Sequence, residues 1–364
     1  FADYLKVLER HRHNFVRLWV ADTAWSPITK SAIEPQPFVR SGPGKAADGG
    51  LKFDLTALNQ AYFDELRARV IAARDAGMYV SVMLFNSWGV SRYPKPHDTP
   101  WNYHPFHKDN NVNGIDGDPN KDGRGLEYQG LRDPAITRLQ EAYVRKVIDT
   151  VNDLDNVLYE ICNEGHGNSK DWQYHLTGFI QRYEKTLPRQ HLVTVTGYTI
   201  PTADLLASPA EVVAPALPKR GAEPTVATGQ KVVILDSDHN GPHRRNPDWV
   251  WRAFLNGNHP IIMDWWSGEE WEPIRRTLGQ TRALARKVNL ATLTPQPDLS
   301  STGYCLANPG HEYLVYQPSP GAAFTVRLEA GGHGFEWFDP NRGETAGAGT
   351  FTAKTGDRSF TAPF

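Results

Sequence analysis

The chain has little cysteine, no long apolar segment and almost no net charge, and each of these absences excludes a class of protein. Its 364 residues include only two cysteines, Cys162 and Cys305, so we expect no disulfide framework. No apolar run approaches the roughly 20 residues that a membrane-spanning helix requires. Lysine and arginine number 39 against 41 aspartates and glutamates, which gives no reason to expect nucleic acid or an anionic membrane as partner. We therefore expect an uncharged or weakly charged partner.

The chain also lacks an initiator methionine and a visible signal peptide. Because it begins at Phe1, we expect further residues upstream in the complete protein. A cleaved export signal would agree with this beginning, and we expect a secreted or periplasmic protein.

Aromatic residues, in contrast, are plentiful: 11% of the chain is aromatic, with 11 tryptophans and 14 tyrosines. Several lie in segments predicted as loops, where an aromatic face can stack on a sugar ring. For any single tryptophan, packing in a large core is an equally good interpretation. The length fits a barrel of roughly 250 residues followed by a smaller domain.

Short apolar runs alternate with amphipathic helical stretches up to about residue 273, which is typical of βα units around a parallel sheet. Strands are predicted at residues 14–20, 78–85, 156–162, 191–196, 211–214, 231–235 and 260–263. Helices are predicted at residues 4–10, 60–76, 134–154, 172–186 and 272–289. A (β/α)8 TIM barrel needs one strand more than these seven. We expect that strand upstream of Phe1, or else an unusual closure of the barrel.

The composition changes near residue 290, where glycine, threonine and alanine become more frequent. Short alternating runs follow at residues 304–307, 312–316, 323–328 and 334–338, separated by proline and glycine turns. This pattern predicts a small antiparallel β-sandwich. We therefore expect a catalytic barrel at residues 1–290 and a β-sandwich domain at residues 291–364.

A long segment rich in asparagine, glycine and aspartate occupies residues 86–131, far beyond an ordinary connection, and favours a lid or cleft wall. Residues 109–114 match the beginning of a calcium loop, D-x-N-x-N-G. The match fails at its twelfth position, which is Asn120 rather than glutamate, and the flanks are not helical. A loop held by asparagine and aspartate side chains is the preferred interpretation, and a structural cation is the alternative. We predict no metal and no cofactor.

Active sites of barrels lie at the carboxyl ends of their strands, where this chain places unusual polar residues. One strand ends at Asn163-Glu164-Gly165-His166, and a strand end can hold a general acid rigidly beside a glycosidic oxygen. The alternative makes Glu164 a helix cap or a loop carboxylate in an ion pair.

Two later strands also end in polar or aromatic side chains. In the first, Asp236 and Asp238 share one face, with Asp238 at the rim, where a carboxylate can attack an anomeric carbon. This acidic pair could instead bind a cation or brace Arg17. The second is followed by Trp265 and Trp266, whose rings could form the floor of a sugar subsite or pack in the core.

A pair of carboxylates on opposite sides of a barrel mouth suits glycoside cleavage, in which one protonates the leaving oxygen and the other attacks or activates water. A carboxyl separation of roughly 5–5.5 Å implies retention of configuration, and roughly 6.5–9.5 Å implies inversion.

These strand ends resemble the clan of retaining (β/α)8 glycoside hydrolases that includes the family 5 cellulases, in which the fourth strand ends in Asn-Glu and the seventh in a nucleophilic carboxylate. Asn163-Glu164 matches the first signature. The strand at residues 14–19 and the terminal segment at residues 337–344 resemble more closely the apiosidase-like glycoside hydrolases that carry a C-terminal β-sandwich labelled as collagen-binding.

The resemblance implies a role for individual residues. Glu164 would be the acid/base, Asp238 the nucleophile, Asn163 a partner of the sugar hydroxyl next to the reacting carbon, and Arg17 a brace for Asp238. Trp265 would be a stacking platform. The clan's nucleophile is ordinarily glutamate, so Asp238 is a departure that favours a furanoside or another unusual substrate, or a reaction other than plain retention.

The predicted function is therefore hydrolysis of O-glycosidic bonds in a poly- or oligosaccharide, by retaining double displacement and without a cofactor. Further side chains at strand ends or on the long loop are predicted to line the cleft: Trp88, His104, His107, His166, Tyr198, His239, Asp264 and Trp266. Two other functions stay open. One is a carbohydrate-binding barrel that has lost catalysis, and the other is a metal-dependent hydrolase built on Asp236, Asp238 and His239.

Overall fold

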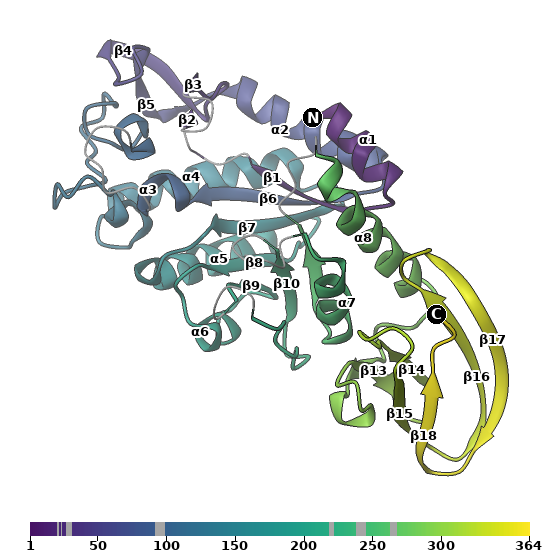
Figure 1. The fold of residues 1–364 in the computed structure, drawn as a ribbon. Helices are drawn as coiled ribbons and strands as arrows, with labels where there is room; N and C mark the ends of the chain where they lie inside the picture. Colours follow the sequence, from purple (N-terminus) through teal and green to yellow (C-terminus); the bar gives the residue numbers. More distant parts are fainter. Residues whose placement is uncertain are drawn as a thin grey trace. The chain divides into compact units, whose positions relative to one another are not determined.

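The computed structural model describes residues 1–19, 22, 24–26, 31–91, 99–217, 222–237, 245–262 and 268–364 (Figure 1). The chain divides into two compact units, one of Phe1–Leu5 and Asn14–Pro215, the other of Lys6–His13 and Ala216–Phe364. Parallel strands follow one another in chain order, with β1-β6-β7-β8-β9 in the first unit and β10-β11 in the second. This confirms the predicted α/β fold class, a (β/α)8 barrel followed by small antiparallel sheets. Among the described helices, none combines the length and the apolar character that crossing a bilayer requires.

The first unit contains the parallel strands β1 (Phe15–Trp19), β6 (Tyr79–Asn86), β7 (Val157–Asn163), β8 (Val193–Gly197) and β9 (Val212–Pro215). Its helices are α1 (Ala2–Arg10), which continues into the second unit, α2 (Gln60–Asp75), α3 (Trp88–Ser91), α4 (Pro134–Val151), α5 (Lys170–Glu184) and α6 (Thr202–Leu206), together with the 3-10 turns η1 (Pro100–Tyr103), η2 (Leu126–Gln129) and η3 (Gly167–Ser169). Its antiparallel strands are β2 (Trp25–Ser26), β3 (Ser31–Ala32), β4 (Phe38–Lys45) and β5 (Leu51–Leu58).

Local signals in the sequence account for the helices and the central strands. The side chain of Asn59 accepts a hydrogen bond from Ala61 N and begins α2, and Asp133 does the same for α4 through Ala135 N. Seven of the eight residues of β6 are buried, as expected where helices and other strands cover both faces of a parallel sheet.

Side-chain hydrogen bonds join the helices that follow these strands. Tyr62 on α2 and Tyr143 on α4 share a hydrogen bond of 2.9 Å between their hydroxyls. Trp172 on α5 donates from its indole nitrogen to Gln140 on α4 at 2.9 Å. These buried polar groups are satisfied across the packed helices, so the layer has one defined arrangement.

The structure adds elements that the sequence pattern did not predict. The antiparallel hairpin of β4 and β5 and the short pair β2–β3 lie between β1 and α2 in the chain (Figure 1). Strand β4 carries Gly42-Pro43-Gly44, and its register with β5 shifts between Arg40 and Lys45. Such a strand has no regular alternation, which is the signal that strand prediction needs.

The second unit contains β10 (Val232–Asp236), α7 (Pro247–Leu255), β11 (His259–Ile261), the turn η5 (Glu269–Trp271) and α8 (Glu272–Ala285). These are followed by β12 (Thr294–Pro295), the turn η6 (Pro297–Leu299), β13 (Cys305–Asn308), β14 (Glu312–Val315), β15 (Ala323–Leu328), β16 (Gly331–Asp339), β17 (Glu344–Ala353) and β18 (Gly356–Thr361). The later strands form the antiparallel sheets β12-β13-β14, β15-β18 and β16-β17. The sandwich arrangement, the domain boundary at residue 290 and a first barrel strand upstream of Phe1 stay predictions.

Candidate functional site

The strand ends of β6 and β7 lie side by side, because Asn86 and Asn163, the last residues of these strands, are register partners. Asn163 is only 6% exposed. Its amide nitrogen donates to Asn86 Oδ1 at 3.1 Å, and its Oδ1 accepts from Arg17 Nη2 at 2.8 Å. Asn86 Oδ1 also accepts from the backbone nitrogen of Trp88 at 3.0 Å. The predicted site residue Asn163 is therefore held in one orientation from two neighbouring strands.

Arg17 on β1 lies at the centre of this network. Its Nε donates to Glu160 Oε2 at 2.9 Å and its Nη2 to Glu160 Oε1 at 2.5 Å, a bidentate pair. The Ser81 hydroxyl donates to the same carboxylate at 3.1 Å. Glu160 is 2% exposed, so its charge is compensated inside the barrel sheet. The sequence interpretation gave no role to Glu160, although a charged residue inside an apolar strand was a signal that could have identified it.

Glu164 follows Asn163 and has an unusual backbone conformation. Its φ is 50°, in the left-handed region that residues other than glycine rarely adopt, and its side chain is half-buried. Gly165 comes next in a crowded position, because a Cβ there would lie 2.2 Å from Gln173 Nε2 and 2.6 Å from Thr196 O. The carbonyl of Gly165 accepts a hydrogen bond from Tyr198 N at 2.9 Å. The turn after β7 is thus fixed against β8 and α5, and it sets the direction of the Glu164 side chain.

His166 is buried at the start of η3, where its carbonyl accepts from the Ser169 hydroxyl at 2.7 Å. Burial, with a further contribution from the positive charge of Arg124, lowers the pKa of His166 to about 4. Its Nε2 has no hydrogen-bond partner among the described residues. His166 is therefore neutral near pH 7, and its ring can exchange a hydrogen bond but carries no charge.

His104 belongs to a buried cluster on the long loop after β6. Its Nε2 lies 3.2 Å from Asp22 Oδ2, and the Tyr128 hydroxyl donates to the same Asp22 oxygen. The ring of Trp101 stacks on the His104 ring with centroids 4.9 Å apart. Because His104 is 2% exposed, its present contacts serve the packing of the loop. His107, also predicted to line the cleft, is partly exposed, and burial lowers its pKa.

Trp88 and Tyr198 follow the ends of β6 and β8, the two strands that flank β7. Trp88 is half-buried as the first residue of α3, and Tyr198 is 44% exposed. Both therefore belong to the same edge of the sheet as Glu164. The other predicted site residues lie outside the described residues: Asp238, His239, Asp264, Trp265 and Trp266. Their roles, and the separation between the two catalytic carboxylates, stay predictions.

The loop at residues 109–114 confirms the preferred interpretation of a turn held by its own side chains. Asn110 donates to the carbonyls of Asn102 and His104 at 2.8 and 3.0 Å. Asn111 donates to the carbonyls of His107 and Ile115, each at 3.0 Å. These amides are occupied by the backbone. A different group, Asp118, Asp122 and Glu127, brings three carboxylates close enough to share a metal ion.

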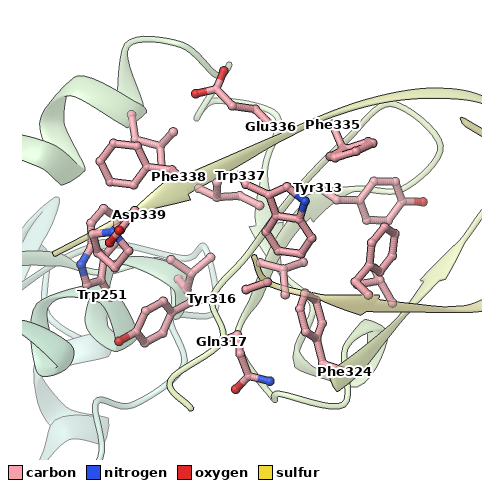
Figure 2. A pocket seen from close by; sticks show the side chains of 18 of the residues that line it. Trp251, Tyr313, Tyr316, Gln317, Phe324, Phe335, Glu336, Trp337, Phe338 and Asp339 are labelled. Carbon is pink, nitrogen blue, oxygen red and sulfur yellow. The ribbon is translucent and has the colours of Figure 1, made fainter. Parts of the chain in front are cut away.

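A cavity of about 870 Å³ lies in the second unit, and none of the predicted site residues is among the described residues that line it (Figure 2). Aromatic side chains line it and pack on one another: Trp251 lies 5.9 Å from Phe338 between ring centroids, and Phe324 lies 6.1 Å from Trp337 edge to face. Residues of both hydrophobic clusters of this unit contribute to the lining. The cavity opens to solvent, since Phe335 and Phe364 in its lining are exposed, and we interpret it as a hollow between α7, α8 and the antiparallel sheets.

Parallel strands with polar side chains gathered at their carboxyl ends define the class of this protein as an α/β barrel with a strand-end site. Residues 4–199 match the family model described as a domain of unknown function, DUF6298, and the chain belongs to that family. No curated protein matches the chain.

Solved structures are similar to this chain in fold. A "putative glycoside hydrolase" from Bacteroides vulgatus ATCC 8482 has a TM-score of 0.54 and 15% identity; the match covers 92% of this chain and 61% of that one. The endo-beta-1,4-mannanase from Thermotoga petrophila has a TM-score of 0.46 and 12% identity, with 99% and 93% covered. Endo-glycoceramidase II from Rhodococcus sp. has a TM-score of 0.47 and 14% identity, with 98% and 90% covered. At such identities the likeness concerns the fold, and this chain spans less than two thirds of the Bacteroides protein.

Proposed function

We propose that the protein is a glycoside hydrolase that cleaves O-glycosidic bonds in a poly- or oligosaccharide by retaining double displacement. The observation that carries the proposal is the backbone of Glu164, a non-glycine residue with φ of 50° at the carboxyl end of a parallel strand. Such a conformation costs of order 1–3 kcal/mol and is concentrated at functional sites. The name of the Bacteroides vulgatus protein of similar fold agrees with the proposal.

In the proposed reaction, the carboxylic acid of Glu164 donates its proton to the glycosidic oxygen. The carboxylate of Asp238 attacks the anomeric carbon, the bond to the leaving oxygen breaks, and a covalent glycosyl-enzyme forms. The Glu164 carboxylate then takes a proton from water, whose oxygen attacks the anomeric carbon and releases Asp238. Both residues thereby return to their starting protonation states.

Asn163 would orient the sugar in this reaction. One hydrogen of its amide nitrogen is used by Asn86, and its oxygen is used by Arg17. The second amide hydrogen would donate to the hydroxyl next to the reacting carbon. Arg17, which we predicted as a brace for Asp238, would in addition act through Asn163 as a positioning residue.

The remaining predicted side chains would form the walls of the cleft. Trp88 and Tyr198 come from the strand ends that flank β7, and the first is half-buried whereas the second is exposed. Trp265 and Trp266 would provide the stacking floor, with Asp264, His239 and His166 beside it. His104 and His107 would shape the loop that borders this cleft.

The first test is a comparison of Glu164→Gln with the wild-type chain on aryl glycosides, furanosides included, whose leaving groups range from poor to good. We expect a loss of about 10²–10⁴-fold in kcat/KM for poor leaving groups and a much smaller loss for 2,4-dinitrophenolate, which leaves without protonation. Asp238→Asn should lose activity on every substrate, because each needs the nucleophile. Glu9→Gln, at an exposed position of α1, is the matched control and should behave as the wild type.

Two results would contradict the assignment. Unchanged turnover in Glu164→Gln removes its acid/base role, and equal losses for all leaving groups indicate a structural role. The stereochemistry of the first-formed product, followed by NMR, tests the mechanism separately, since inversion would exclude double displacement.

A further inference from the structure

The loop between β6 and α4 contains a calcium-loop pattern that differs from the one at residues 109–114. The segment Asp118-Pro119-Asn120-Lys121-Asp122-Gly123 matches D-x-N-x-D-G at every position. Its twelfth position is Gln129 rather than glutamate, but a carboxylate is present at Glu127, four residues after the glycine. In such loops the side chains at positions one, three and five provide oxygen ligands, and a glycine at position six makes the sharp turn. Because the pattern is short, the case for a metal site depends on how the structure arranges these side chains.

The backbone of this segment curls around its own side chains. Lys121 and Gly123 both have positive φ, 61° and 75°. Lys121 N donates to the Asp118 carbonyl at 3.0 Å, and Gly123 N donates to Asp118 Oδ2 at 2.9 Å. Asp122 N donates to Asn120 Oδ1 at 2.9 Å. The side chains at positions one, three and five therefore turn toward the inside of the loop.

Three carboxylates converge inside this curl. Asp118, Asp122 and Glu127 each offer one oxygen, and these oxygens lie within 4.8 Å of one another. Calcium–oxygen distances of about 2.3–2.6 Å place two ligands on opposite sides of one ion about 5 Å apart. The three oxygens can thus share one calcium ion without a rearrangement of the chain. Asn120 Nδ2 donates to Glu127 Oε1 at 2.6 Å and holds the last carboxylate in place.

Buried oxygens without a partner give the second, independent sign of a ligand. Asp118 is 7% exposed, and its Oδ1 has no hydrogen-bond partner among the described residues. Oε2 of Glu127 is buried and equally unpartnered in this part of the chain. Leaving a buried carboxylate oxygen unsatisfied is unfavourable, and native proteins usually satisfy such atoms. A cation bound by these carboxylates would provide the partner that such oxygens lack.

None of the ion pairs between the described residues includes Asp118, Asp122 or Glu127. Two buried carboxylates elsewhere in this unit differ: Glu160 is paired with Arg17, and Asp48 with Arg40. The segment at residues 109–114 also differs, because the backbone already occupies its amides.

We propose that Asp118, Asp122 and Glu127 bind a calcium ion that fixes the long loop after β6, with Asn120 holding Glu127 in place. Several carboxylate oxygens in irregular geometry suit calcium, whereas magnesium demands near-ideal octahedral geometry at about 2.0–2.1 Å and keeps more of its water. The site adjoins the loop core, because Gly117 and Gly125 lie so close to Trp101 that a Cβ would come within 2.6 and 2.3 Å of its ring.

The ion therefore stabilises the packing around Trp101 and, through the stacked ring of His104, the contact with Asp22 after β1. Its role is structural, and it does not depend on the proposed glycosidase reaction.

The test is calcium binding to the full chain after treatment with EDTA and desalting. Titration calorimetry with CaCl₂ should show one site with a Kd of about 10⁻⁶–10⁻⁴ M, and 1 mM calcium should raise the Tm by several degrees. Terbium should bind in place of calcium and show luminescence sensitised by the neighbouring Trp101. Magnesium should compete at least about tenfold more weakly.

Paired variants distinguish this site from non-specific binding to acidic groups. Asp122→Asn and Glu127→Gln should each weaken calcium binding at least about tenfold, whereas Asp109→Asn, in the other motif-like segment, should leave it unchanged. Two variants are used because either alone could impair folding, which circular dichroism would show. The proposal would be overturned if the wild-type chain, after removal of metal with EDTA, bound neither calcium nor terbium. It would also be overturned if Asp122→Asn bound calcium as tightly as the wild type. No substrate is present, so failure here and failure of the glycosidase assignment are separate results.

Discussion

Replacement of Arg17 by methionine tests whether the stability of the fold around the strand-end site depends on the ion pair between Arg17 and the buried carboxylate of Glu160. Methionine retains an unbranched side chain of similar length but removes every donor. Glu160, at 2% exposure, would lose both hydrogen bonds from the guanidinium and keep the Ser81 hydroxyl, 3.1 Å away. Asn163 Oδ1 would lose its donor as well. The perturbation leaves a buried carboxylate without its cation.

The expected cost follows from this change. Breaking a buried ion pair by removal of one partner destabilises a protein by about 3–5 kcal/mol, because the remaining charge stays uncompensated. The second variant, Arg17→Met combined with Glu160→Gln, removes that charge. We expect it to recover at least about 2 kcal/mol relative to Arg17→Met alone, since the coupling between two groups in direct contact is large and non-additive.

Urea unfolding followed by tryptophan fluorescence and circular dichroism measures these differences. The matched control is Arg67→Met. The ion pair of Arg67 with Asp153, at 2.7 Å, has side chains that are 39% and 61% exposed, so its loss should cost less than about 1 kcal/mol. If Arg17→Met costs no more than this control, or if the double variant is less stable than Arg17→Met, the argument from buried charge is wrong.

Two further predictions concern pH and packing. Burial, with a smaller contribution from the charge of Arg124, lowers the pKa of His166 to about 4, below the ordinary 6.5. As the pH falls, His166 is therefore protonated in the unfolded chain before it is protonated in the folded chain. The contribution of neutral His166 to the free energy of unfolding is complete above pH 6.5 and falls by up to about 3 kcal/mol toward pH 4. Urea unfolding at pH 4.5 and 7.5 measures it, and His166→Gln should show a smaller change in the free energy of unfolding between these two pH values. An identical change in both chains would contradict the prediction. Gly125→Ala should cost about 2–4 kcal/mol, because its φ is +62° and a Cβ would lie 2.3 Å from Trp101. Gly114→Ala is the control, because Gly114 has a φ of +69° but no atom near the position of a Cβ, so this change measures the backbone cost alone. It should destabilise the chain less than Gly125→Ala. Equal decreases of the Tm in the two variants would exclude the clash with Trp101.

The parallel strands could be predicted because their apolar runs are bounded by clear helix signals. Strand β6 was expected at residues 78–85 and spans Tyr79–Asn86, and the strand expected at residues 156–162 spans Val157–Asn163. Each is buried along nearly its whole length, so composition alone identifies it. The same logic placed Asn163 and Glu164 at a carboxyl end.

Other features depend on contacts that composition does not encode. Strand β4 is interrupted by Gly42 and Gly44 and pairs with β5 in an irregular register, so no period marks it. Strand β5 does alternate, with Leu51, Phe53 and Leu55 between polar residues, and this signal was missed. The two motif-like segments at residues 109–114 and 118–123 share aspartate, asparagine and glycine at positions one, three and six. They differ in which backbone groups donate to or accept from their side chains, and this difference appears only in the folded structure.

Two glutamates, one inside β7 and one directly after it, show most clearly what the structure adds. Glu160 and Glu164 are four residues apart, and strand alternation alone would place both on one face. Arg17 takes up the charge of Glu160, which is buried, so this carboxylate cannot exchange a proton with a substrate without breaking the bidentate pair. Glu164 lies beyond the last strand residue, half-buried, with a positive φ that ends the alternation. The end of the strand therefore separates a buried, ion-paired carboxylate from a half-buried one beyond it, and this is the physical reason for which we propose Glu164 rather than Glu160 as the acid/base.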